Sequence, residues 1–132
     1  MTYLLDTNIC IYFLNRHPEV IKRVAQCRYN EIAISIVTLA ELQFGAYNSI
    51  QVENNIKRIE FFLERIQLLD LTPKTTDIFA RIKASLRKAG SIIDDFDILI
   101  GATAIENGLT IVTDNERHFS RMKELHVVNW LW

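Results

Sequence analysis

The chain has 132 residues, 49% apolar and 23% charged, with a formal net charge of −1, which excludes a disordered protein and fits one globular domain over residues 1–132. It contains no apolar run of membrane-spanning length and no signal-peptide pattern at its start, so we expect a cytoplasmic protein without membrane contact. Cys10 and Cys27 lack a CxxC spacing and are interpreted as core thiols, which argues against a disulfide framework or a zinc site.

Apolar runs alternate with amphipathic segments along the whole chain. In chain order they predict a strand at 2–6, helices at 7–15 and 18–28, a strand at 32–34, helices at 35–47 and 52–66, a strand at 67–71, helices at 73–89 and 96–106, a strand at 110–112, a helical turn at 115–119 and a strand at 126–129. Helix caps are expected at Thr7 or Asn8, Ser35 or Thr38, and Asp94 or Asp95.

The expected strands are short and apolar on both faces, and helices separate them. This pattern is typical of an α/β fold in which a short, mainly parallel sheet of four to five strands lies between two layers of helices. We expect Leu39, Leu42 and Phe44 to point into the core from the helix at 35–47. Sites in open α/β sheets form beyond the carboxyl ends of the strands, where Asp6 and Asp114 are expected to lie.

Four carboxylates stand in apolar surroundings in the sequence: Asp6 and Asp114 after strands, and Glu41 and Asp97 on apolar helices. A carboxylate is costly to desolvate unless a positive group holds it. A divalent cation, Mg²⁺ or Mn²⁺, explains all four together. We call Asp6, Glu41, Asp97 and Asp114 the acidic set.

Each member of the acidic set also has a structural interpretation. Asp6 is placed to cap a helix, and Glu41 is placed to form a capping box with Thr38. Asp97 is placed to interact with a helix dipole, and Asp114 to start a turn. The local sequence favours the ligand interpretation for Asp6, Asp97 and Asp114, most strongly for Asp6 and Asp97. For Glu41 that interpretation depends on the family resemblance described below.

Three further residues are candidates for the outer part of the site. Thr113 can donate a hydrogen bond to a ligand carboxylate, whereas Asp95 and Glu116 are better explained as surface or capping residues. Oxygen ligands around one or two cations suit the hydrolysis of a phosphodiester. The three histidines do not pair at metal-ligand spacing, and no motif of another hydrolase or nucleotide-binding class is present.

The net charge does not exclude a nucleic-acid partner. If bound metal offsets the four negative charges of the acidic set, −1 plus 4 leaves +3 on the rest of the chain. Four basic residues gather on the helix expected at 73–89, namely Arg81, Lys83, Arg87 and Lys88. The simpler interpretation of this cluster is a solvated helix face.

Four blocks of the sequence resemble the PIN-domain nucleases, in the order of that family and across almost the whole chain. The blocks are Leu4 to Ile11, Ser35 to Ala46, Gly90 to Ala104, and Leu109 to Asn115 followed by Phe119. The short length further resembles VapC, the toxin of VapBC toxin–antitoxin modules.

This resemblance implies a PIN fold and a Mg²⁺-dependent endoribonuclease, with Mn²⁺ as a substitute, that cuts structured RNA such as tRNA loops. Asp6, Glu41 and Asp97 fall on the three principal acidic positions of the family, and Asp114 on the more variable fourth. Asp6 and Asp97 are expected to bind metal directly, and Glu41 and Asp114 directly or through water. The family also implies a homodimer and a VapB-like antitoxin, which alone would contact DNA.

Aromatic residues suggest where that antitoxin could bind. Tyr47, Phe61 and Phe62 are candidates for a groove that accepts an amphipathic segment, although core packing explains such residues equally simply. Trp130 and Trp132 are expected either to dock at an interface or to pack on their own domain.

Three other functions remain open on the sequence alone. The first is a PIN nuclease acting on rRNA or DNA, against which the missing extra domains speak. The second is an inactive PIN module that only binds an antitoxin, which the complete acidic set disfavours. The third is a phosphoaspartate receiver domain, which would need a second acid near Asp6 and a late lysine that this chain does not offer.

Overall fold

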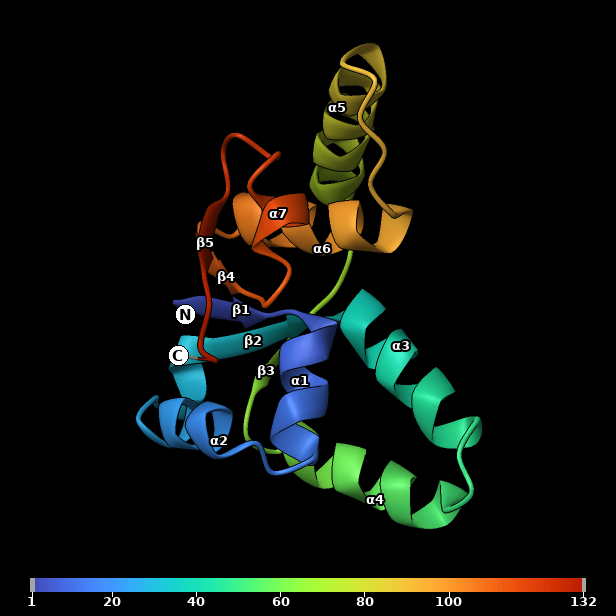
Figure 1. Cartoon of the computed structure of the whole chain (residues 1–132), viewed down its shortest axis with the longest axis vertical. Coiled ribbons are helices and arrows are strands. Elements are labelled where there is room, and N and C mark those ends of the chain that lie inside the picture. The colour runs from blue at the N-terminus through green and yellow to red at the C-terminus, as the bar shows by residue number, and fades with distance from the viewer. Residues whose placement is uncertain (1, 132) are drawn as a thin grey trace.

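The computed structural model describes residues 2–131 and has a parallel sheet between two helical layers, as Figure 1 shows. The elements in chain order are β1 (Tyr3–Leu5), α1 (Thr7–Leu14), α2 (Pro18–Ala25), the 3₁₀ turn η1 (Tyr29–Glu31), β2 (Ile32–Ser35), α3 (Ile36–Tyr47), α4 (Val52–Leu63), β3 (Gln67–Leu69), α5 (Pro73–Lys88), α6 (Asp95–Glu106), β4 (Thr110–Val112), α7 (Glu116–Phe119) and β5 (His126–Val128). The expected α/β/α architecture is confirmed.

All five strands pair in parallel, in the order β3-β2-β1-β4-β5. The central strand β1 places Leu4 opposite Ala33 on one side and Ile111 on the other. These residues are completely buried because helices cover both faces of the sheet, which explains why the strands are apolar on both sides. The register leaves the carboxyl ends of β1 and β4 side by side.

Two apolar cores fill the two sides of the sheet. The helices α1 to α4 pack on one face around Ile9, Ile34 and Phe62. On the other face, α5, α6 and α7 pack around Ile98, Ile100 and Phe119. Helix α5 projects away from the rest of the molecule, and the loop after it returns to the start of α6 (Figure 1).

Close packing fixes α6 on its side of the sheet. A Cβ atom on Gly101 would collide with the sulfur of Met122, so glycine lets this side chain lie directly against α6, and a larger residue would require the flexible Met122 side chain to shift. At the far end of α6, the Glu106 carboxylate accepts hydrogen bonds from the hydroxyls of Thr72 and Thr75 at the start of α5. Together these contacts hold the middle and the C-terminal end of α6, the helix that carries Asp97 in its first turn.

Two expectations on local structure are wrong. Asp6 itself is the N-cap of α1, so Thr7 and Asn8 lie inside that helix. Phe44 is 70% exposed and does not reach the core, because Leu39 and Leu42 occupy the buried face of α3. Ser35, and not Thr38, caps α3 through a hydrogen bond from Val37 N–H, which leaves Glu41 outside any capping box.

The chain end packs on its own domain as far as the structure describes it. Trp130 is buried, and its ring makes an edge contact with Tyr3 at a centroid distance of 5.1 Å. The expectation for Trp132 falls outside residues 2–131. Cys10 is buried as expected, whereas Cys27 is only half-buried; neither forms a disulfide.

Candidate functional site

The candidate site lies where β1 and β4 end beside the first turns of α1 and α6. Asp6 follows β1 directly, and its N–H donates to the carbonyl of Val112 on β4 at 2.9 Å. Thr113 and Asp114 follow β4. Adjacent strands thus deliver two carboxylates and a hydroxyl to one edge of the sheet, as the sequence predicts.

Asp6 is the most enclosed carboxylate of the acidic set, with 3% exposure. One oxygen accepts from Thr7 N–H at 2.7 Å, and the other from the Thr113 hydroxyl at 2.7 Å. The pKa of Asp6 is raised to about 6, mainly by burial; the two hydrogen bonds oppose this shift, and the charges of Asp97 and Asp114 contribute to it. The free protein therefore holds an electrostatically unfavourable negative charge at this point.

Glu41 reaches the same region from α3. Its Oε1 accepts from the Thr7 hydroxyl at 2.6 Å, and the hydroxyl oxygen of Thr38 lies 3.2 Å from that of Thr7. Partial burial is the main cause that raises the pKa of Glu41, and the charge of Asp97 contributes. Thr7 is the first residue of α1 and follows Asp6 directly, so its hydrogen bond places Glu41 close to Asp6.

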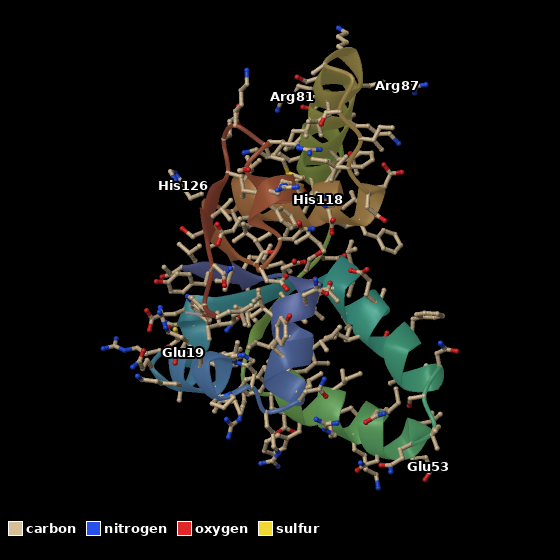
Figure 2. The ribbon with its side chains drawn as sticks, viewed as in Figure 1. Glu19, Glu53, Arg81, Arg87, His118 and His126 are labelled. Atoms are coloured by element: carbon tan, nitrogen blue, oxygen red, sulfur yellow. The ribbon has the colours of Figure 1, made fainter. Side chains whose placement is uncertain are left out.

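Asp97 lies in the first turn of α6, which Asp94 caps by accepting from Phe96 N–H. Its Oδ2 is 3.4 Å from Nδ1 of His118 on α7, and this nitrogen is also 2.8 Å from the Asn115 amide. Burial raises the pKa of Asp97, while His118 opposes this effect. In Figure 2, His118 lies beside α6, below the projecting helix α5.

Asp114 is held differently, by two side chains of α1. Asn8 Nδ2 lies 3.3 Å from one carboxylate oxygen and the Tyr12 hydroxyl 3.1 Å from the other. The hydrogen bond to Asp114 raises the pKa of Tyr12, so this hydroxyl stays a donor over the physiological range.

Of the three candidates for the outer part of the site, the structure shows one in contact with the acidic set. Thr113 contacts Asp6, as expected for an outer member of the site. Asp95 instead pairs with Lys83 of α5 at 2.9 Å on the surface, and Glu116 is exposed at the start of α7. Sequence reasoning missed Thr7, Tyr12 and His118, of which only Thr7 carried a signal, through its place directly after Asp6.

The donor set fits a hard divalent cation. The acidic set offers only oxygen ligands. Burial is the main cause that raises the pKa of Asp6, Glu41 and Asp97, and repulsion from neighbouring carboxylates contributes, so a cation at this place would stabilise the charged carboxylates. Within residues 2–131, no three His, Cys, Asp or Glu side chains already stand in a metal-holding arrangement.

A separate hollow of about 810 Å³ lies between α1, α2 and α4. Its floor is apolar and includes Phe61 and Phe62, of which Phe62 is 1% exposed and also packs on Phe13 in the core. Basic side chains line it as well, namely Arg16, Lys57, Arg58 and Arg65. Tyr47 does not line this hollow and lies exposed at the end of α3.

The family model and the similar sequences both identify the same family of proteins. The family model of the PIN domain matches residues 3–125. The chain is 42% identical over 132 residues to a ribonuclease VapC2 of Haemophilus influenzae, covering 99% of both chains. It is 32% identical over 130 residues to a tRNA(fMet)-specific endonuclease VapC of Salmonella typhimurium, covering 98% of both.

The fold also matches that of a solved relative. A chain in the crystal structure of VapBC2 from Rickettsia felis, bound to a DNA fragment from their promoter, superposes with a TM-score of 0.92. The two chains are 37% identical, and the match covers 98% of this chain and 99% of that one.

No helix within residues 2–131 is both long and apolar enough to cross a membrane.

Proposed function

This chain belongs to the VapC family of PIN-domain toxin ribonucleases, and we propose that it cuts structured RNA with a divalent cation held by its acidic set. The observation that carries the proposal is the buried Asp6, placed beside Thr113 and within the electrostatic influence of Asp97 and Asp114. Mg²⁺ is the proposed cation, with Mn²⁺ as a substitute.

Each carboxylate has a proposed role. Asp6 and Asp97 would hold the cation, and Asp114 would complete its site directly or through water. When bound, the cation supplies positive charge for the scissile phosphate and makes water a better nucleophile. Glu41 would orient the attacking water and accept its proton, because it is less enclosed than Asp6 and its pKa is raised.

Thr7 and Thr113 support these roles by donating to the carboxylates. Each hydroxyl occupies one acceptor position of its partner, and a carboxylate has about four, so the remaining lone pairs stay free for a cation or a water. These hydrogen bonds also fix the orientation of Asp6 and Glu41 before a cation arrives, which lowers the cost of binding it.

tRNA is the substrate we propose, on the grounds that one relative is named as a tRNA(fMet)-specific endonuclease. The basic residues of α5 would contact RNA phosphates along this projecting helix. Arg81 and Lys83 are partly used in pairs with Asp77 and Asp95. Arg87 and Lys88 are exposed in the last turn of α5, and Figure 2 shows Arg87 pointing outward from this helix. Phosphate contacts of this kind position an RNA without reading its sequence.

We further propose a VapB-like antitoxin as the partner, with DNA contacted only through it. The solved relative from Rickettsia felis is a VapBC2 complex on promoter DNA. The hollow between α1, α2 and α4 has an apolar floor and basic residues around it, which suits an amphipathic segment with acidic residues. Phe61 lies at this hollow and is 60% exposed, so it is the proposed contact residue.

A homodimer is also proposed. Phe44 is exposed on α3, Ile50 is fully exposed just after it, and Phe96 is half-exposed at the start of α6. Apolar side chains at these positions would be covered in a dimer. The molar mass in light scattering tests this expectation.

Cleavage of tRNA by the purified chain tests the proposed function. We expect cleavage with Mg²⁺, none with EDTA, and none with Asp6→Asn, whose amide keeps the size of the carboxylate but not its charge. Asp70→Asn is a matched control, because Asp70 is exposed and its carboxylate accepts from the N–H of its neighbour Leu71. Full activity of Asp6→Asn, or cleavage that continues in EDTA, would contradict the proposal.

A further inference from the structure

Asp114 is held by two residues that stand one helical turn apart on α1. Positions i and i+4 share one face of a helix, so Asn8 and Tyr12 approach Asp114 from the same side. Asn8 Nδ2 is 3.3 Å from Oδ1, and the Tyr12 hydroxyl is 3.1 Å from Oδ2. With one donor on each oxygen, the plane of the carboxylate is fixed.

The Tyr12 ring is itself held in place. It makes an edge contact with His17 at a centroid distance of 5.4 Å and an interplanar angle of 69°. His17 in turn caps α2, since its Nδ1 accepts from Val20 N–H at 3.4 Å. This edge contact helps to place the Tyr12 hydroxyl against Asp114.

The helix that carries Tyr12 also begins at Asp6. Thr113 donates to Asp6, and the next residue, Asp114, accepts from Tyr12. Two consecutive residues after β4 are thus tied to the two ends of one short helix. The relative positions of Asp6 and Asp114 depend on this connection.

We propose that Tyr12 is a positioning residue, which holds Asp114 in the orientation that divalent-cation binding requires, with Asn8 in a supporting role. The inference rests on the proposed function. Two donors leave about two of the four acceptor positions of the carboxylate free for the cation or its water. Groups that orient a metal ligand in this way typically change metal affinity by about 10–100-fold.

A purely structural role is the competing explanation. In that case the hydrogen bond would only fasten α1 to the segment after β4, and its loss would lower the melting temperature without a specific effect on the cation. Affinity for Mn²⁺ alone separates the two explanations, because it involves neither RNA nor turnover.

The test is calorimetric titration of the chelator-treated full chain with Mn²⁺. Tyr12→Phe removes the hydroxyl and keeps the ring on His17, so we expect binding about tenfold weaker. Tyr47→Phe is the matched control, because Tyr47 is 68% exposed and lies away from the acidic set; it should bind Mn²⁺ as the parent does. Asn8→Ala should weaken binding less than Tyr12→Phe.

A double variant shows whether Tyr12 acts through Asp114. In an Asp114→Asn background, Tyr12→Phe should cause no further loss of affinity. Unchanged or tighter Mn²⁺ binding by Tyr12→Phe, or an equal loss in the Asp114→Asn background, would overturn the inference. Asp6→Asn tests the proposed function separately: if this variant binds Mn²⁺ as well as the parent, the proposed metal site itself is wrong.

Discussion

The ends of β1 and β4 lie side by side, yet they present their carboxylates in different ways. Asp6 after β1 is buried, accepts from a backbone N–H and a hydroxyl, and has its pKa raised to about 6. Asp114 after β4 is half-buried and is held by two side chains of α1. One sheet edge therefore holds a buried carboxylate that a backbone N–H and a hydroxyl orient, and a half-buried carboxylate that only side chains of α1 are seen to orient in the described residues.

The largest expected effect is the loss of a principal ligand. Asp97→Asn should lower the rate of RNA cleavage by about 10³-fold, because a bound cation contributes several kcal/mol to catalysis. Asp114→Asn should cost only about tenfold, since Asp114 is half-buried and is proposed to complete the site directly or through water. Single-turnover cleavage of tRNA at saturating enzyme measures both. Equal losses would contradict the distinction between the two kinds of ligand.

The second prediction concerns the stability of the metal-free protein against pH. The folded chain keeps a proton on Asp6 up to about pH 6, whereas the unfolded chain loses it near the ordinary value of 3.8. Asp6 therefore lowers stability as pH rises through this window, by ~3 kcal/mol in total, with no further change above it.

Urea unfolding in EDTA at pH 4.5 and 7.5 measures this effect. Asp6→Asn cannot titrate at this position, so its difference from the parent isolates the contribution of Asp6. The free energy of unfolding of the parent, relative to that of the variant, should be higher at pH 4.5 than at pH 7.5. A constant difference between the two proteins at both pH values would contradict the burial of a charged Asp6.

The third prediction concerns the hydrogen bond that joins the two strand ends. Thr113→Val keeps the shape of the side chain and removes the donor to Asp6, so it should destabilise the metal-free protein by ~2 kcal/mol at pH 7.5. The loss should shrink at pH 4.5, where Asp6 is protonated. Thr110→Val is the matched control, because Thr110 opens β4, the strand that Thr113 follows, and lies at the opposite end of this strand from the acidic set.

The smallest expected effect lies away from the sheet edge, on α5. Replacing Arg87 and Lys88 with alanine should weaken tRNA binding a few-fold and lower the slope of log K against log salt by about 1 to 2. The matched control is a double alanine variant of Lys22 and Lys57, which are exposed on α2 and α4. An equal change in slope for both variants would show that α5 has no special role.

The sequence was sufficient to predict the layers and the strand ends. Continuous apolar runs such as those in β1 and β4 fit only strands covered on both faces, and the acids that follow them then share one edge. The cap of α1 was mispredicted because three consecutive residues, Asp6, Thr7 and Asn8, can all act as N-caps. The backbone conformation decides among them: Asp6 is extended, and the helix begins at Thr7.

Other features depended on tertiary packing. Phe44 was assigned to the core because α3 carries apolar residues around much of its circumference, so periodicity does not identify its buried face. The contact between His118 and Asp97 requires α7 to lie on α6, which the close approach of Met122 to Gly101 permits. No short-range pattern encodes that approach.

Mn²⁺ anomalous scattering from crystals of the chain tests the central claim most directly, since it locates the cation without reference to activity. We expect a peak at the edge of the sheet within ligand distance of Asp6 and Asp97, and its loss in Asp6→Asn crystals soaked in the same way. A peak elsewhere on the molecule, or one that persists unchanged in Asp6→Asn, would contradict the account.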